Sequence, residues 1–284
     1  MFIGTENLTH VYMPGTSYAA GALQDVSFSL ERGEFAVIIG PSGSGKSTLV
    51  QHLNGLLKPT AGRVFFKGRT VCFGKQEMIR LRRQVGLVFQ MPEEQFFSDT
   101  VYDEVAFAPR NLGLSAADES TRVEEALEQV GLKARLYRDR HPFQLSAGQK
   151  RLVAIASVLS LKPEVLILDE PTAALDFAGR HSLFNLLADL NRNLGITILV
   201  ATHHLDEAAS LADSVFVLKD GRLVLAGLAT DIFRQREQLR KIGLALPPIT
   251  EIMYGLADRG LPVDPAVFTL SDARRVINTL KRRH

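Results

Sequence analysis

Cysteine is almost absent from this chain of 284 residues, which contains only Cys72 and therefore no internal disulfide bond. Such sparse cysteine is typical of a reducing compartment. Nothing near Cys72 suggests a nucleophilic site, so we expect an ordinary residue of a β-strand. No apolar stretch is long enough to span a membrane, and no basic and then apolar leader opens the chain. We therefore expect a cytoplasmic protein, or one that only its partners hold on a membrane.

Net charge is also small. The formal value is +2, which does not indicate a protein built mainly to hold nucleic acid. The basic residues 281–284 are more typical of a solvated end than of a binding patch. The sequence has no internal repeat and no low-complexity segment. Its length and its 46% hydrophobic content are enough for one large domain and a small appendage.

A glycine-rich segment lies between the apolar run 35–39 and a helix-forming run at 47–53. Its residues are Gly40, Pro41, Ser42, Gly43, Ser44, Gly45, Lys46, Ser47 and Thr48. This order matches the phosphate-binding pattern G-x-x-x-x-G-K-[ST] in its strand–loop–helix context. Glycines let backbone N–H groups point at anionic oxygens, and the helix dipole adds to that field. Because Lys46 can reach the β- and γ-phosphates and Ser47 can bind Mg²⁺, the segment predicts a nucleoside triphosphate site.

A second pattern is the apolar run 165–168, which ends in Asp169 and Glu170. Doubly wound sheets bind ligands at the carboxyl ends of their strands. Asp169 can hold Mg²⁺ through water, and Glu170 can act as a general base on an attacking water. A strand that ends in two acids often arises by chance, but the phosphate-binding loop upstream favours the functional interpretation.

A third pattern opens a predicted helix at Ala147. Ser146 by itself is an ordinary N-cap. The same helix start, with Gly148 and Gln149, exposes N–H groups and a hydroxyl at the positive end of the helix dipole, which is typical of an anion site. Both interpretations are compatible, because the capping geometry is what exposes those donors.

The order of the expected elements indicates a largely parallel α/β sheet that a helical segment interrupts. Strands are expected at 7–12, 23–30, 63–67, 85–89, 165–168, 196–201, 214–218 and 222–226. Helices are expected at 47–53, 76–84, 100–112, 116–130, 147–161, 178–193 and 204–212. From about residue 229 a mostly helical tail follows, which prolines and glycine break into short pieces.

Together these segments resemble the ATP-binding-cassette (ABC) ATPase family over roughly residues 3–228. Residues 40–48 resemble its Walker A motif, 165–169 its Walker B motif, and 145–149 its LSGGQ signature. The resemblance implies an α/β P-loop NTPase with an N-terminal antiparallel β-subdomain and an inserted α-helical subdomain at about 91–161. Residues 1–228 would form the ATP-binding domain and 229–284 a small helical C-terminal extension. The implied cofactors are ATP and Mg²⁺.

The resemblance also implies roles for single residues. Glu170 looks like the catalytic glutamate. Gln90 looks like the Q-loop glutamine, a catalytic residue that binds Mg²⁺ together with Ser47 and Asp169. Asp176 looks like the D-loop aspartate.

Two further assignments have a competitor in the sequence. His203 looks like the switch histidine, and we favour it over His204 because the strand at 196–201 delivers it to the sheet edge of Asp169. Tyr12 occupies the place of the aromatic residue that stacks on adenine. Tyr18 competes with it, and either tyrosine could simply pack in the β-subdomain.

The family resemblance implies a head-to-tail dimer, in which one subunit binds ATP at Lys46 and the other contacts it through its signature. The signature contacts are Ser146, Ala147, Gly148 and Gln149. Ala147 departs from the family pattern, which usually has glycine there, and its methyl group could perturb the fit to the γ-phosphate. Closure over ATP and opening after hydrolysis would turn chemical energy into movement.

The segment 89–113 resembles the ATPase subunits of energy-coupling factor (ECF) transporters, including the cobalt and nickel types. Its distinctive residues are Pro92, Glu93, Thr100, Val101, Phe107, Pro109 and Asn111. Ala108 replaces a more usual glycine, and residues 13–22 resemble the second of the two paired ATPases. The resemblance implies a heterodimer with a second ATPase, on the cytoplasmic face of the cell membrane. This heterodimer would power an importer of vitamins or transition-metal ions.

Two membrane subunits are implied as further partners, a scaffold and a substrate-binding protein. The scaffold would dock at residues 90–97, where Phe96 and Phe97 would line a groove or instead pack the helical subdomain. The transported substrate is not visible in this sequence, because another subunit would select it.

The alternatives fit less of the sequence. A conventional ABC importer ATPase remains open. A chromosome-maintenance ATPase would insert long coiled coils between residues 48 and 145, and a translation factor would carry two cassettes. A nucleotide kinase explains neither residues 145–150 nor His203, and a binding module without activity does not explain Glu170.

Overall fold

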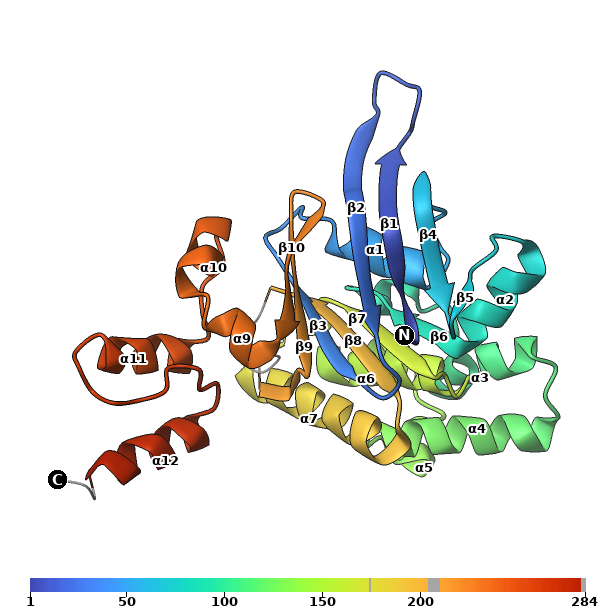
Figure 1. Ribbon diagram of the computed structural model, residues 1–284. Helices are drawn as coiled ribbons and strands as arrows, with labels where there is room; N and C mark the ends of the chain where they lie inside the picture. Colours follow the sequence, from blue (N-terminus) through green and yellow to red (C-terminus); the bar gives the residue numbers. More distant parts are fainter. Residues whose placement is uncertain (174, 204–209, 282–284) are drawn as a thin grey trace.

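A central sheet with the strand order β10-β9-β3-β8-β7-β6 organises the computed structural model, which describes residues 1–173, 175–203 and 210–281 (Figure 1). Its strands are β3 (Phe35–Ile39), β6 (Val85–Val88), β7 (Val165–Asp169), β8 (Thr197–Thr202), β9 (Ser214–Lys219) and β10 (Arg222–Leu228). All neighbours pair in parallel except β9 and β10, which form an antiparallel hairpin at the edge. Strands β3, β7 and β8 are buried along their whole length, as their continuous apolar runs predict for parallel strands.

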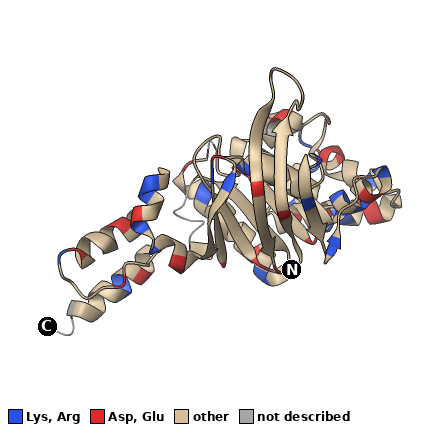
Figure 2. Ribbon diagram, turned by 45° about the horizontal axis from the view of Figure 1, so that its top comes forward, with Lys and Arg blue, Asp and Glu red and all other residues tan. Residues whose placement is uncertain are grey.

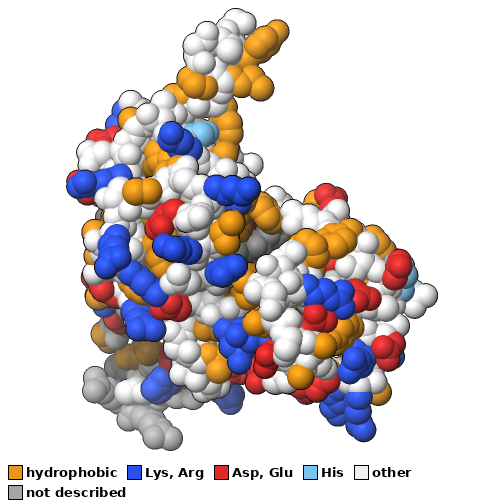
Figure 3. All heavy atoms as spheres, turned by 90° about the vertical axis from the view of Figure 1, so that its right-hand side faces the viewer, with side chains coloured by type: hydrophobic (Ala, Val, Ile, Leu, Met, Phe, Trp, Pro, Cys, Tyr) orange, Lys and Arg blue, Asp and Glu red, His pale blue; other side chains and the backbone are white. Residues whose placement is uncertain are grey.

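An antiparallel sheet with the order β2-β1-β4-β5 stands beside this core. Its strands are β1 (Ile3–Tyr12), β2 (Ala20–Leu30), β4 (Ala61–Phe66) and β5 (Arg69–Thr70). The expected strands were correct in place, although β1 begins four residues earlier than predicted. The tip of the β1–β2 hairpin projects from the body and carries apolar side chains (Figure 3).

Helices cover the central sheet and also form the tail. They are α1 (Lys46–Leu53), α2 (Lys75–Gln84), α3 (Val101–Asn111), α4 (Ala116–Gln129), α5 (Ala134–Tyr137), α6 (Ala147–Leu159), α7 (Phe177–Leu194), α9 (Ala229–Phe233), α10 (Arg236–Ile242), α11 (Pro248–Ala257) and α12 (Leu270–Lys281). Side chains of Thr100, Ser115 and Ser146 cap α3, α4 and α6, which explains where these helices begin. The predicted helix at 204–212 lies largely outside the described residues.

The core lies on both faces of the central sheet. Along β3, Val37 and Ile39 pack toward α6 and α7, whereas Ala36 and Ile38 pack toward α1 and the antiparallel sheet. Alternate side chains of a strand point to opposite faces, so one buried strand supports two hydrophobic clusters. The predicted α/β fold with an antiparallel β-region, inserted helices α3 to α6 and a helical tail is therefore confirmed.

The tail extends to one side of the molecule (Figure 1). Its first part is anchored in the main core by Ile232 and Phe233, whereas α11 and α12 share a small cluster around Met253. Both basic and acidic residues occur along these helices (Figure 2), and ion pairs such as Arg236–Asp258, at 2.8 Å, join α10 to the end of α11.

Cys72 is not a strand residue, contrary to the expectation. It lies exposed between β5 and α2. The chain leaves the sheet after two residues of β5, and the Cys72 carbonyl accepts a hydrogen bond from the Gly74 amide at the N-cap of α2.

Within the described residues, none of the helices has the length and hydropathy needed to cross a membrane.

Candidate functional site

The glycine-rich loop connects β3 to α1, so it lies at the carboxyl end of a central strand. A Cβ atom at Gly40 would overlap the Leu218 carbonyl oxygen, and only glycine fits there. Gly45 is the N-cap of α1 and has a φ of 100°, in the left-handed region that glycine adopts without strain. These two positions explain why the chain can curl tightly between strand and helix.

Lys46, the first residue of α1, is buried. Its Nζ donates hydrogen bonds to the carbonyl oxygens of Gly40 at 2.9 Å and Pro41 at 3.2 Å, and lies 3.7 Å from Glu170 Oε1. The ammonium group is thus held inside the curl of the loop by backbone oxygens and one carboxylate. An arriving phosphate would meet a cation that is already positioned.

Asp169 ends β7 and is 4% exposed. Burial raises the pKa of its carboxyl group, while a hydrogen bond from the Ser47 hydroxyl acts in the opposite direction. Its Oδ1 atom is buried without a hydrogen-bond partner among the described residues. A carboxylate with a spare oxygen beside a hydroxyl is the hard oxygen donor set that Mg²⁺ prefers, so these residues fit that ion.

Glu170 and His203 meet at the same sheet edge. Glu170 Oε2 lies 2.9 Å from His203 Nδ1 and accepts the His203 backbone N–H at 3.3 Å. The Glu170 amide in turn donates to the Ala201 carbonyl at 2.8 Å. Because β7 and β8 are neighbours, the predicted delivery of His203 to this edge is confirmed; His204 lies outside the described residues.

The backbone of Glu170 is strained. Its φ is 45°, which a residue with a side chain adopts at a cost of roughly 1–3 kcal/mol. The surrounding contacts maintain this conformation, and they turn the carboxylate back toward Lys46 and His203. Such strain in a buried glutamate at a strand end is typical of a functional position.

A cleft of about 560 Å³ brings distant parts of the chain together. It is lined by Tyr12, Gly21, Ala22, Ser42, Gly43, Ser44, Gly45, Lys46, Ser47, Thr48, Gln90, Glu170 and His203. The structure therefore groups Tyr12 and Gln90 with the phosphate loop, although the intervening sequence is long. Gln90 is exposed at the start of the segment that leads from β6 to α3.

Tyr12 and Tyr18 occupy different surroundings. The Tyr12 hydroxyl lies 3.0 Å from Thr48 Oγ1, on the phosphate loop. Tyr18 is 80% exposed on the connection between β1 and β2. Of the two tyrosines, only Tyr12 lines the cleft.

The segment 146–149 lies at the amino end of α6 and does not line that cleft. The Ser146 hydroxyl accepts the Gln149 amide, and the Gln149 side chain accepts the Ser146 amide, which is a complete capping box. Ser146 and Ala147 are exposed, and a side chain at Gly148 would meet open space. This helix start is therefore accessible to another molecule.

Asp176 also lies outside the cleft. Its side chain accepts the Gly179 amide at 2.7 Å and caps α7. Ala174, which precedes it in the expected D-loop, is outside the described residues. The structure gives Asp176 a capping function, which is compatible with a contact to another chain.

Sequence reasoning missed Arg151, on α6. Its buried guanidinium donates to the carbonyl oxygens of Gln90 at 2.7 Å and Ala173 at 3.3 Å. It thereby joins the segment after β6 to the segment after Glu170. The available signal was an arginine followed directly by the apolar run 152–156 of the predicted helix, because arginine beside a buried face needs polar partners.

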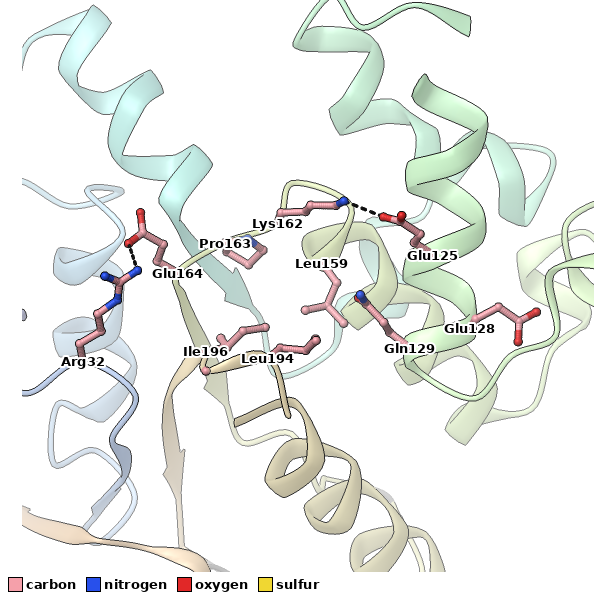
Figure 4. Close-up of a pocket in the computed structure, with 11 residues that line it drawn as sticks. Arg32, Glu125, Glu128, Gln129, Leu159, Lys162, Pro163, Glu164, Leu194 and Ile196 are labelled. Carbon is pink, nitrogen blue, oxygen red and sulfur yellow. Dashed lines mark hydrogen bonds and ion pairs between the residues drawn. The ribbon is translucent and has the colours of Figure 1, made fainter. Parts of the chain in front are cut away.

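A second and larger cavity, of about 830 Å³, lies at the opposite edge of the sheet (Figure 4). Its apolar lining comes from Leu159, Pro163, Leu194 and Ile196. Arg32 pairs with Glu164 and Lys162 with Glu125 around the rim. With these charges already paired and the strand carboxyl ends far away, the chemistry gathers in the smaller cleft.

Comparisons with known proteins agree with this geometry. A sequence model described as "ABC transporter" matches residues 23–173. The chain is 44% identical to the energy-coupling factor transporter ATP-binding protein EcfA2 of Clostridium acetobutylicum, across 99% of this chain and 100% of that protein.

Solved structures are similar as well. The structure of cbiO1 from Clostridium perfringens, part of the ABC transporter complex cbiONQ, has a TM-score of 0.76 and 40% identity, covering 89% of this chain and 98% of the other. The dimeric ATP-binding cassette MJ0796 bound to ADP and Pi has a TM-score of 0.71 and 30% identity, covering 80% of this chain and 99% of the other.

Proposed function

Since this chain belongs to the ABC transporter family, and within it to the ATP-binding subunits of energy-coupling factor transporters, we propose that it hydrolyses ATP to power an ECF-type importer. One observation carries the proposal: the Glu170 carboxylate lies between Lys46 and His203 and lines the phosphate-loop cleft. A base, a cation and an orienting imidazole converge there, which is the arrangement that attack on a terminal phosphate requires.

The cleft would bind ATP with the triphosphate in the loop formed by residues 40–48. Lys46 would exchange the carbonyl oxygens of Gly40 and Pro41 for β- and γ-phosphate oxygens. Tyr12 would stack on the adenine, because its ring lies at the cleft beside the start of α1.

Ser47, Asp169 and Gln90 would hold Mg²⁺. The spare Asp169 oxygen and the hydroxyl beside it support this assignment. When bound, Mg²⁺ neutralises phosphate charge and polarises the bond that breaks. Burial disfavours the charged form of Asp169, so a cation beside it would stabilise the carboxylate.

Glu170 would act as the general base. Its carboxylate takes a proton from water while the water oxygen attacks the γ-phosphorus. The bond between that phosphorus and the β–γ bridging oxygen breaks, and ADP leaves with the bridging oxygen and its electron pair. His203 holds the Glu170 carboxylate through Nδ1 and its backbone N–H, and thereby orients the base.

A second ATPase subunit would complete the site. The exposed helix start with Ser146, Ala147, Gly148 and Gln149 would contact the γ-phosphate bound by the partner, and Asp176 would lie at the same interface. A dimeric cassette similar to this chain, described as bound to ADP and Pi, supports a dimer. We propose a heterodimer, because this chain is similar to one named member of the ECF ATPases, EcfA2.

The membrane scaffold would dock at residues 90–97. Of the two phenylalanines there, Phe96 is buried in the core, whereas Phe97 is 64% exposed and its ring packs edge-on against Phe107 at 4.8 Å. Met91 is half exposed nearby. The scaffold would link this subunit to a substrate-binding subunit and hold it at the cytoplasmic face of the membrane.

We propose the same division of this chain as the sequence predicts. The ATP-binding domain would comprise residues 1–228, with the helical subdomain at about 91–161, and the C-terminal extension would comprise residues 229–284.

The test is co-purification from detergent-solubilised membranes, followed by phosphate release from Mg-ATP. We expect recovery of a different ATPase, a membrane scaffold and small membrane proteins that bind substrate, with steady ATP hydrolysis by the complex. Recovery with a pair of conventional permeases would leave the hydrolysis and overturn the ECF assignment. Absence of phosphate release from the intact complex would overturn the enzymatic role.

A further inference from the structure

Two buried histidines lie beneath the cleft and take no part in the roles above. His10 belongs to β1 and is 7% exposed, and His52 belongs to α1 and is fully buried. His52 Nε2 lies 3.1 Å from His10 Nδ1. The pair therefore joins the antiparallel sheet to the helix that follows the phosphate loop.

Chemistry defines the direction of this hydrogen bond. His52 Nδ1 lies 2.7 Å from the Thr48 carbonyl oxygen, which can only accept, so Nδ1 carries a proton. Burial lowers the pKa of His52 to about 4, so its ring is neutral near pH 7 and Nε2 is an acceptor. His10 Nδ1 must then be the donor, and the Thr48 carbonyl determines the tautomer of His52.

The chain of contacts returns to the cleft. The His10 ring packs edge-on against the Tyr12 ring at 4.5 Å, with 82° between their planes. The Tyr12 hydroxyl lies 3.0 Å from the Thr48 hydroxyl, and the Thr48 carbonyl accepts from His52. His10, His52, Thr48 and Tyr12 form a closed ring of contacts between β1 and α1.

This ring holds an aromatic side chain that is otherwise weakly constrained. Tyr12 is 40% exposed and ends β1, where the connection to β2 begins. The phosphate loop holds its hydroxyl, and His10, locked by His52, supports its ring. A stacking surface that is ordered before the ligand arrives spares the entropy cost of ordering it on binding.

We propose that His10 and His52 are positioning residues that orient Tyr12 relative to the phosphate loop and thereby raise the affinity for the adenine base. The inference rests on the proposed function, in which Tyr12 stacks on adenine. The pair has no contact with the phosphates in this proposal. Altering it should therefore weaken binding of the adenine base and leave binding of the phosphate chain unchanged.

The test compares two substitutions of His10 that each remove one contact. His10→Phe keeps an aromatic ring beside Tyr12 and removes the donor to His52. His10→Asn keeps an N–H donor and removes the ring. The probes are Mg-ATP and Mg-tripolyphosphate, since tripolyphosphate has the phosphate chain without the base.

We expect both variants to bind ATP about three- to tenfold more weakly, the effect of losing a modest contact, and to bind tripolyphosphate within about twofold of the unaltered protein. Tyr12→Ala should weaken ATP binding by about five- to 100-fold with the same insensitivity for tripolyphosphate. In the Tyr12→Ala background, His10→Asn should add nothing, because it acts through Tyr12.

Each other result is decisive. If Tyr12→Ala weakens ATP binding and the His10 variants do not, the pair is merely structural and the inference fails alone. If Tyr12→Ala has no effect, the stacking role and the inference fail together. Should the variants not fold, ¹⁵N NMR of the unaltered histidine rings decides: we expect His10 to respond to ATP and not to tripolyphosphate, and equal responses overturn the proposal.

Discussion

At the scale of single residues, Glu170 is a buried acid that two neighbours hold in a strained conformation. Its carboxylate contacts Lys46 and His203, which come from other elements of the sheet edge. Its φ of 45° is a costly conformation that persists because the surrounding structure holds it, and such strain is typical of functional positions. The proposed hydrolysis of ATP therefore depends on the Glu170 carboxylate as the general base.

Glu170→Gln keeps the shape of the side chain and removes the base. We expect turnover to fall by at least about 100-fold, the effect of losing a general base, with ATP affinity nearly unchanged. Phosphate release and equilibrium ATP binding measure the two properties. Hydrolysis at the unaltered rate would show that another group is the base.

Lys46→Ala is the matched control for this substitution. It removes the cation that faces the cleft, and ATP affinity should fall by about tenfold or more, because charge-assisted hydrogen bonds are lost. Together the two variants separate binding from chemistry.

At the scale of elements, strand β1 and helix α1 are joined through buried polar groups as well as apolar packing. His52 is fully buried in α1, where its neutral ring bridges Thr48 and His10. Arg151 joins α6 to the segments after β6 and β7 in a similar way. Buried polar groups of this kind specify how elements fit together, and their loss is costly.

Protonation of His52 should make stability depend on pH. The unfolded residue titrates near 6.5 and the folded one near 4, so the unfolded state binds more protons between these values. The contribution of His52 to the free energy of unfolding is complete above pH 6.5 and falls by about 3 kcal/mol as pH drops to 4. Urea unfolding at several pH values measures this slope. His52→Gln should flatten it, and an unchanged slope in that variant would contradict the assignment.

Arg151→Met should destabilise the fold. It leaves the carbonyl oxygens of Gln90 and Ala173 without the guanidinium, which costs about 2–4 kcal/mol. Arg151→Lys keeps the charge, reaches fewer acceptors and should lose about half as much. Urea midpoints compare the two variants, and equal stability of Arg151→Met and the unaltered protein would refute the role.

At the scale of the whole molecule, the cleft and the signature helix start lie apart on one chain. Ser146 and Ala147 are exposed, whereas Lys46 and Glu170 are buried at the cleft. In the proposed function, one chain would therefore cover a bound triphosphate from one side and a second chain would cover the other.

Substitution of Ser146 tests that arrangement. Asp and Asn both cap helices, so Ser146→Asp and Ser146→Asn should fold equally well. The added negative charge of Asp would repel the partner's γ-phosphate, and ATP-driven association should fall by about tenfold or more, whereas Asn should preserve it. Sedimentation velocity with and without Mg-ATP measures this association. The Glu170→Gln substitution is added in each protein to prevent hydrolysis. Equal association of both variants would argue against the signature contact.

Consecutive residues determined much of this protein by themselves. The loop at 40–48 is a local backbone structure, so its glycines and Lys46 specify it wherever a strand and a helix flank it. The apolar runs of β3 and β7 likewise predict buried parallel strands. The turn at Asp220 and Gly221, both with positive φ, was also predictable as a hairpin.

Only the tertiary structure decided which distant side chains meet. Tyr12 lines the cleft and Tyr18 does not, because the long β1–β2 hairpin carries Tyr18 away from the body. The contact of His10 with His52 and the bridge made by Arg151 depend on how a sheet and a helix pack, which no local spacing records. Neighbouring residues determine the local backbone structure, whereas these contacts form only when the hydrophobic core brings separate elements together.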